Sequence, residues 1–121
     1  MDRRKIAAFA ASAVLLVPLT AGAAQAAPLT GSGRGTWYEP GLGSCGTTST
    51  SSDSVVALST NFGARYCGKS IKVTYKGRTV TATVADSCSS CGNGDLDMSP
   101  GAFNQLAPLG DATVPVSWSI S

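Results

Sequence analysis

A segment with strict alternation of apolar and polar side chains is the feature of this chain that most constrains its fold. Apolar residues occupy every second position over residues 71–75 and again over 80–84, and lysine and threonine fill the positions between them. Lys76-Gly77, which separates the two runs, is typical of a tight turn. The pattern predicts a β-hairpin with one apolar face.

Two further strands are expected near the ends of the domain. The first covers residues 35–38. The last covers residues 113–120, where every second residue is apolar and Pro115 lies on the opposite face, at a position that needs no ladder donor. Many short strands with glycine-rich turns predict an all-β domain, a small closed or nearly closed β-barrel.

One or two short helices complete the predicted fold. Ser99 and Pro100 predict the start of one of them, because serine caps free N–H groups and proline fits the first helical position. Its inward face is expected to consist of Phe103, Leu106 and Ala107.

Residues 1–26 have the pattern of a secretory signal peptide. Three basic residues at positions 3–5 precede an apolar run over 6–19, and Ala24-Gln25-Ala26 fits a cleavage site. The sequence therefore predicts a secreted, extracellular, soluble monomer with no membrane segment. Residues 27–34 are expected to be a flexible N-terminal lead-in and residues 35–121 the folded domain.

Charge and composition exclude several functions. Removal of residues 1–26 leaves 95 residues with six Lys or Arg and six Asp or Glu, a formally neutral chain. Neutrality argues against nucleic-acid and membrane partners, which need a surplus of cations. The chain has no histidine, which excludes histidine triads and the usual zinc proteases. We expect no metal and no cofactor, and any proton chemistry must use carboxylates.

The domain contains four cysteines, at positions 45, 67, 88 and 91. An even number in a small exported domain predicts disulfides, and four cysteines allow three pairings. Cys88 and Cys91 form a C-x-x-C motif, for which a redox or zinc role is the alternative. A second C-x-x-C motif and a thioredoxin-like context are both missing, which favours disulfides.

Seven motifs in one order resemble the secreted double-psi β-barrel superfamily, which includes rare lipoprotein A, expansins, barwin and loosenins. They begin at Gly35, Gly43, Val55, Cys67, Val80, Asp95 and Val114, and they extend over residues 35–120. The resemblance implies a six-stranded double-psi β-barrel with a polysaccharide groove. It also implies that Cys45 pairs with Cys67, which leaves Cys88 with Cys91.

The same resemblance implies site residues. Thr36 and Tyr38 match an expansin-like T-x-Y stretch, Asp97 matches the key carboxylate, and Asp86 matches a T-D segment. The groove is expected to use Asp97 and Asp86 as the candidate catalytic carboxylates. Its expected substrate-binding residues are Trp37, Tyr38, Thr36 and Asp95.

Each of these residues also has a structural interpretation. Asp86 can accept hydrogen bonds from loop amides near Cys88, and Asp97 can help to cap the helix that starts at Ser99. Trp37 and Tyr38 point to opposite faces of a strand, so only one of them readily lines a groove, and Trp37 can belong to the core. Glu39 is one position early for the second carboxylate of related hydrolases and is interpreted as a surface residue.

The sequence leads to three hypotheses for function. The first is an expansin-like or loosenin-like protein that binds cell-wall polysaccharide, either cellulose, chitin or peptidoglycan, and loosens it without ordinary hydrolysis. The second is an inhibitor of papain-like cysteine proteases that uses the loops 40–46 and 88–93. The third is a peptidoglycan lytic transglycosylase, which is disfavoured because the signature residues of that class are missing here. A non-enzymatic role is favoured.

Overall fold

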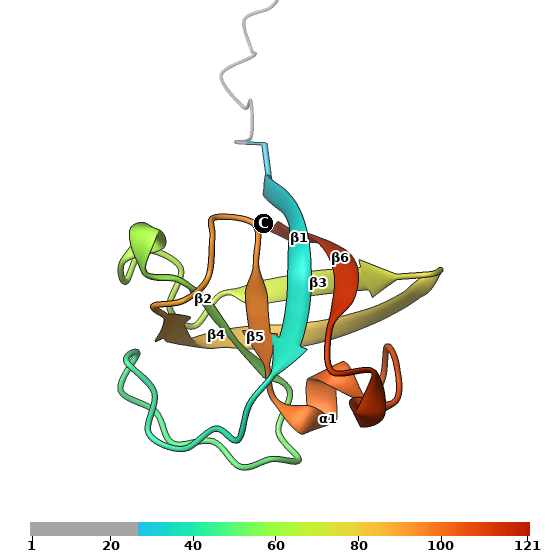
Figure 1. Cartoon of the computed structure of the whole chain (residues 1–121). Helices are drawn as coiled ribbons and strands as arrows, with labels where there is room; N and C mark the ends of the chain where they lie inside the picture. The colour runs from blue at the N-terminus through green and yellow to red at the C-terminus, as the bar shows by residue number, and fades with distance from the viewer. Residues whose placement is uncertain (1–26) are drawn as a thin grey trace, which may run out of the picture.

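Six strands form a closed barrel in a computed structural model that describes residues 27–121 (Figure 1). The signal peptide predicted over residues 1–26 lies outside the described residues. The strands are β1 (Leu29–Trp37), β2 (Val55–Ser59), β3 (Ser70–Tyr75), β4 (Arg78–Cys88), β5 (Leu96–Met98) and β6 (Val114–Ile120), and the short helices are η2 (Thr60–Phe62), α1 (Pro100–Phe103) and η3 (Leu109–Asp111). The prediction of an all-β barrel with little helix is confirmed.

The strand order around the barrel is β1-β5-β2-β4-β3-β6, and β6 pairs again with β1. Two pairs, β1 with β5 and β2 with β4, run parallel, and the other four are antiparallel. The hairpin predicted from the alternating segment is β3 and β4, joined by a turn at which Lys76 and Gly77 both have positive φ. Antiparallel pairs therefore build most of the wall, and the two parallel pairs join strands that are far apart in sequence.

The core fills the barrel with the apolar faces of the strands. Ile71, Val73, Leu96 and Met98 are fully buried there. The inward residues predicted for the last strand are also buried, while Pro115 is exposed. Trp118 fills one end of the core opposite Gly31 of β1, and a side chain at Gly31 would overlap its ring. These contacts make the barrel a packed body rather than an open channel.

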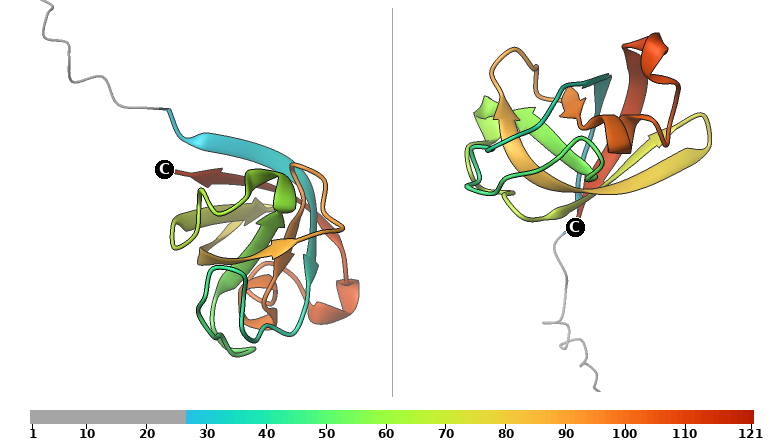
Figure 2. Two further views of the ribbon diagram at one scale, coloured as in Figure 1. Left: turned by 90° about the vertical axis from the view of Figure 1, so that its left-hand side faces the viewer. Right: turned by 90° about the horizontal axis from the view of Figure 1, so that it is seen from below.

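The predicted lead-in is wrong for residues 29–34, because β1 begins at Leu29 and pairs with β6 from Leu29 to Gly35 (Figure 2). The register joins Leu29 to Ile120 and Gly33 to Val116. The sequence did not predict this part of the strand, because a glycine-rich segment is typical of a flexible linker. Here the glycines face inward at positions where neighbouring groups leave no room for a side chain.

The helix and both disulfides agree with the predictions. Ser99 caps α1 by accepting a hydrogen bond from the Ala102 N–H, and the predicted inward face at Phe103, Leu106 and Ala107 is buried. Cys45 is bonded to Cys67, and Cys88 to Cys91. Within residues 27–121 no helix has the length and hydropathy needed to cross a membrane.

Candidate functional site

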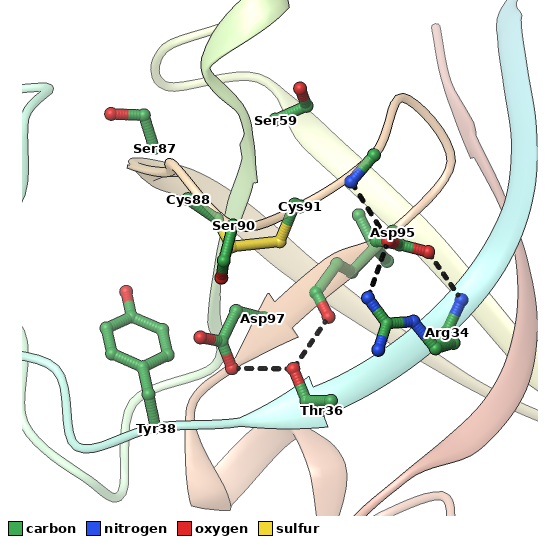
Figure 3. Close-up of a disulfide and its surroundings, with 12 residues drawn as sticks. Arg34, Thr36, Tyr38, Ser59, Ser87, Cys88, Ser90, Cys91, Asp95 and Asp97 are labelled. Atoms are coloured by element: carbon green, nitrogen blue, oxygen red, sulfur yellow. Dashed lines mark hydrogen bonds and ion pairs between the residues drawn. A yellow bond between two sulfur atoms is a disulfide. The ribbon is translucent and has the colours of Figure 1, made fainter.

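Three strands bring Thr36, Asp97 and Asp86 together on one side of the barrel. Figure 3 shows Thr36 and Asp97 joined by a hydrogen bond, with Tyr38 nearby. In β5, Asp97 pairs with Thr36 of β1 on one side and with Ala57 of β2 on the other. Asp86 of β4 pairs with the same Ala57 from the opposite side. The two aspartates thus lie two strand spacings apart, about 10 Å between their Cα atoms.

Asp97 is half-buried and is held by its neighbour on β1. The hydroxyl of Thr36 donates a hydrogen bond to Asp97 Oδ1 at 2.9 Å, and it also lies 3.3 Å from the carbonyl oxygen of Leu96. Burial raises the pKa of Asp97 above its usual value, and the charge of Asp86 adds to the rise, whereas the Thr36 hydrogen bond opposes it. Asp97 therefore keeps its proton to a higher pH than an ordinary aspartate does.

Asp86 is fixed by the backbone rather than by another charge. Its Oδ1 accepts hydrogen bonds from the N–H groups of Ser44 and Ser87, each at 2.8 Å. Its Oδ2 lies 3.4 Å from the Tyr38 hydroxyl, which donates to it. The loop-amide interpretation of Asp86 is thus correct, and the same geometry leaves this partly exposed carboxylate facing Tyr38.

Tyr38 completes the cluster that we name the Asp97 cluster, which consists of Thr36, Tyr38, Asp86 and Asp97. Burial, together with the charge and hydrogen bond of Asp86 and the charge of Asp97, raises the pKa of Tyr38 to about 12. The phenol therefore stays a neutral donor across the physiological range. All four side chains are partly exposed, so a ligand can reach them from solvent.

Two predicted binding residues have other roles in the structure. The ring of Trp37 packs against the core, and its indole N–H donates to the carbonyl oxygen of Leu109 at 2.9 Å. Asp95 accepts hydrogen bonds from the backbone N–H groups of Arg34 and Gly92, and it forms an ion pair with the Arg34 guanidinium at 3.1 Å. Neither side chain belongs to the Asp97 cluster.

The remaining alternatives are also resolved by contacts. The helix α1 is capped by Ser99, so Asp97 is not its cap. Glu39 is an exposed loop residue that accepts a hydrogen bond from the Ser51 hydroxyl. Sequence reasoning missed Ser44, which helps to hold Asp86, because no local signal marks a backbone N–H that meets a carboxylate 42 residues away. Among residues 27–121, no three acidic, histidine or cysteine side chains gather as a metal site would require.

Comparison with known families identifies the class of this barrel. Residues 30–118 match the model of a double-psi β-barrel family described as lytic transglycolase. The chain belongs to this family.

Curated relatives include an inhibitor and an allergen. The papain inhibitor of Streptomyces mobaraensis is 36% identical over 97 residues, which cover 71% of this chain and 68% of the inhibitor. An Asp f 7 allergen homologue of Arthroderma benhamiae is 38% identical over 78 residues, 59% of this chain and 27% of that protein. The chain thus spans about a quarter of the length of the allergen homologue.

Two solved structures have the same fold and more than 30% identity. The Streptomyces papain inhibitor superposes with a TM-score of 0.70 at 33% identity, covering 76% of this chain and 94% of the inhibitor. A point mutant of Clavibacter michiganensis expansin, solved in complex with cellohexaose, superposes with a TM-score of 0.69 at 31% identity. That match covers 77% of this chain and 50% of the expansin.

Proposed function

We propose that this protein is secreted, that it binds a neutral cell-wall polysaccharide at the Asp97 cluster, and that it loosens the polymer without hydrolysing it. The observation that carries the proposal is the pairing of Thr36 with Asp97 and of Tyr38 with Asp86 on one partly exposed surface. Carboxylates and hydroxyls side by side form hydrogen bonds with sugar hydroxyls, and a tyrosine ring can stack on a sugar face.

The comparisons support the ligand class. The expansin that resembles this chain was solved with cellohexaose, a neutral glucan fragment. Residues 27–121 carry equal numbers of acidic and basic residues, which suits a neutral polymer. The signal-peptide pattern at residues 1–26 supports export to where such polymers occur.

The roles of the carboxylates favour binding over hydrolysis. Hydrolysis of a glycosidic bond uses one protonated acid and one free base that face the scissile bond. Asp97 suits the acid, but both oxygens of Asp86 already accept hydrogen bonds from protein donors. Glu39, which follows β1 in the chain, accepts a hydrogen bond from Ser51 in an exposed loop. The cluster therefore has a candidate acid in Asp97, whose pKa is raised, without a free carboxylate as its partner base.

The test compares Asp97→Asn with Asp111→Asn. Asp111 is an exposed aspartate of η3 outside the cluster, so the two variants lose the same charge. We expect Asp97→Asn to bind insoluble cellulose, chitin or peptidoglycan at least about tenfold more weakly, because a hydrogen bond to a charged group contributes about 1.5–3 kcal/mol. Asp111→Asn should bind like the parent protein.

Two results would overturn this function. One is equal polymer binding by both variants, which would remove Asp97 from the binding surface. The other is release of reducing or anhydro sugars that depends on Asp97, which would make the protein an enzyme of the hydrolytic or lytic class. Far-ultraviolet circular dichroism of each variant checks that the barrel is intact.

A second function, inhibition of papain-like proteases, is favoured by one loop. Residues 41–49 form a hairpin in which Leu42 bridges to Thr48, and Cys45 anchors it to Cys67. Leu42 is 75% exposed, the one large hydrophobic residue among positions 27–121 that is so exposed. A rigid loop with an apolar tip loses little entropy when it enters a protease cleft.

Papain inhibition separates this second function from the first. If the loop is inhibitory, Leu42→Ala should weaken inhibition about fivefold or more, because buried anchor residues dominate interface energies. Asp97→Asn should leave inhibition unchanged. No inhibition of papain by the parent protein would exclude this second function and leave the first untouched.

A further inference from the structure

The charges of this neutral domain are strongly segregated along the chain. Residues 54–85 contain five cations, Arg65, Lys69, Lys72, Lys76 and Arg78, and no acidic residue. Residues 79–121 contain Asp86, Asp95, Asp97 and Asp111 and no cation. The cations lie on β3, in the loop before it, in the turn after it and at the start of β4, so they gather around β3 although the whole domain is neutral.

Lys72 lies in one of two adjacent rows of side chains on the outer surface, and the other members of both rows carry hydroxyl groups. The first row crosses four strands through Thr30, Ser119, Lys72 and Thr81, and the second through Ser32, Ser117, Thr74 and Thr79. The residues that flank Lys72, Ile71 and Val73, are fully buried, so both rows face outward. Strand geometry spaces the side chains about 4.8 Å across and about 7 Å along the strands. We name this surface the Lys72 face.

A shallow hollow opens on the Lys72 face. Lys72 lines it together with the hydroxyl residues Thr30, Thr74, Thr79, Ser117 and Ser119. No carboxylate lines this hollow, and the one ion pair within residues 27–121 joins Arg34 to Asp95 elsewhere. The Lys72 ammonium group thus faces solvent among hydroxyls with no acidic partner in the hollow. Asp111, by contrast, lines a separate hollow with Lys76 and Arg78.

Lys72 and Asp97 lie on opposite walls of the barrel, and the strands that the two surfaces share, β1 and β4, contribute to them at opposite ends. In the closed order β1-β5-β2-β4-β3-β6, β3 is three strands from β5 in either direction (Figure 1). A ligand at one wall therefore does not compete for space with a ligand at the other. The two surfaces also have opposite charge, since the cluster carries two aspartates.

We propose that the Lys72 face is a second binding site, for an acidic polysaccharide that carries carboxylates along a hydroxyl-rich chain. One ammonium group among many hydroxyls fits a polymer with sparse charges and many sugar hydroxyls. A nucleic acid has a charge on every residue and needs a denser array of cations. The site goes beyond the proposed neutral-glycan function and depends on none of the residues of the Asp97 cluster.

Two soluble polymers with one backbone test the proposal. Carboxymethylcellulose carries carboxylates and hydroxyethylcellulose does not, so the difference in retardation during affinity electrophoresis measures recognition of the carboxylate. We expect the parent protein to bind carboxymethylcellulose more tightly, with an affinity that falls as salt rises. Lys72→Gln should bind carboxymethylcellulose roughly fivefold more weakly, the upper end of the effect of one exposed ion pair. Its binding to hydroxyethylcellulose should be unchanged.

Two control variants separate a site from general attraction. Arg65→Gln loses the same charge, but Arg65 lies over the ring of Tyr66 outside the hollow. Thr79→Val keeps the charge and the branched shape and removes a hydroxyl. We expect Arg65→Gln to bind nearly as the parent protein does and Thr79→Val to bind carboxymethylcellulose about twofold more weakly.

Several outcomes overturn the site. If Lys72→Gln and Arg65→Gln lose equal affinity for carboxymethylcellulose, the attraction is a general charge effect. If Thr79→Val binds carboxymethylcellulose as the parent protein does, the hydroxyl groups take no part in recognition. Tighter binding to polyphosphate than to carboxymethylcellulose would indicate that the ligand of the Lys72 face is a phosphate-rich polymer and not an acidic polysaccharide. Asp97→Asn distinguishes the two proposals, because it should reduce binding to hydroxyethylcellulose and leave the carboxylate-dependent difference intact.

Discussion

Asp95 and Asp97 are two residues apart and both lie beside β1, yet they have opposite electrostatic environments. Asp95 lies beside Arg34 and Asp97 lies beside Thr36, so the two carboxylates meet β1 at positions that are also two residues apart. N–H donors and the nearby cation lower the pKa of Asp95, whereas burial raises that of Asp97. The surroundings of each carboxylate, N–H donors and a cation at Asp95 and burial at Asp97, cause the difference between the two aspartates.

The largest expected effect is a loss of stability in Asp95→Ala. Asp95 holds the Cys88–Cys91 loop to β1 through Gly92 and Arg34. We expect a loss of about 2 kcal/mol in the free energy of unfolding, since hydrogen bonds to a carboxylate are strong but solvent weakens the exposed Arg34 contact. Urea unfolding at pH 7 measures it. Asp97→Asn is the control, and an Asp95→Ala midpoint equal to the parent's would contradict the structural role.

The second prediction concerns pH, where the two aspartates should act in opposite directions. Because the pKa of Asp95 is lowered in the folded protein, its carboxylate stabilises the fold above the pKa of the unfolded chain, near 3.8. This stabilisation is lost as pH falls through the pKa of the folded protein. The raised pKa of Asp97 means that its charge opposes folding once pH rises through the folded value.

The measurement is unfolding of Asp95→Asn and Asp97→Asn between pH 3 and pH 7. Relative to the parent protein, Asp95→Asn should become less stable as pH rises, while Asp97→Asn should become relatively more stable. Parallel profiles for the two variants would show that their environments do not differ as described.

A smaller effect is expected from Thr36→Val, which makes the neighbour of Asp97 purely apolar. Loss of the donated hydrogen bond should raise the pKa of Asp97 further, because this bond is what opposes the effect of burial. The cost in stability should be about 0.5–1 kcal/mol, the typical value of one hydrogen bond. Carbon-13 NMR titration of the Asp97 carboxyl group reports the shift, and a lower pKa in the variant would refute the assignment.

The smallest effect is expected from Tyr38→Phe. The hydrogen bond from Tyr38 to Asp86 is long, 3.4 Å, so its loss should change stability by less than about 0.5 kcal/mol. Absorbance at high pH should nevertheless change clearly. The parent protein should show one tyrosine that ionises near pH 12 rather than 10, and the variant should lack that step. An unaltered titration would place the shifted phenol elsewhere.

Local patterns in the sequence determined much of the fold. Alternation over residues 71–84 and 114–120 identified the faces of β3, β4 and β6, because a strand has a period of two whatever it pairs with. The capping serine at position 99 identified α1 for an equally local reason. The motif order supplied the superfamily and the disulfide pairing, and both are confirmed.

Only the tertiary structure decided the roles of individual side chains at the site. No local pattern in the sequence predicts that Arg34 lies beside Asp95 and Thr36 beside Asp97. Parallel pairing of β1 with β5 brings each aspartate beside its neighbour on β1, which is about 60 residues away in the chain. Antiparallel pairing with β6 makes the first part of Leu29–Trp37 a strand, where the glycines alone resemble a linker. Periodicity is a local property that a sequence carries, whereas strand register depends on which distant segments can close a packed barrel.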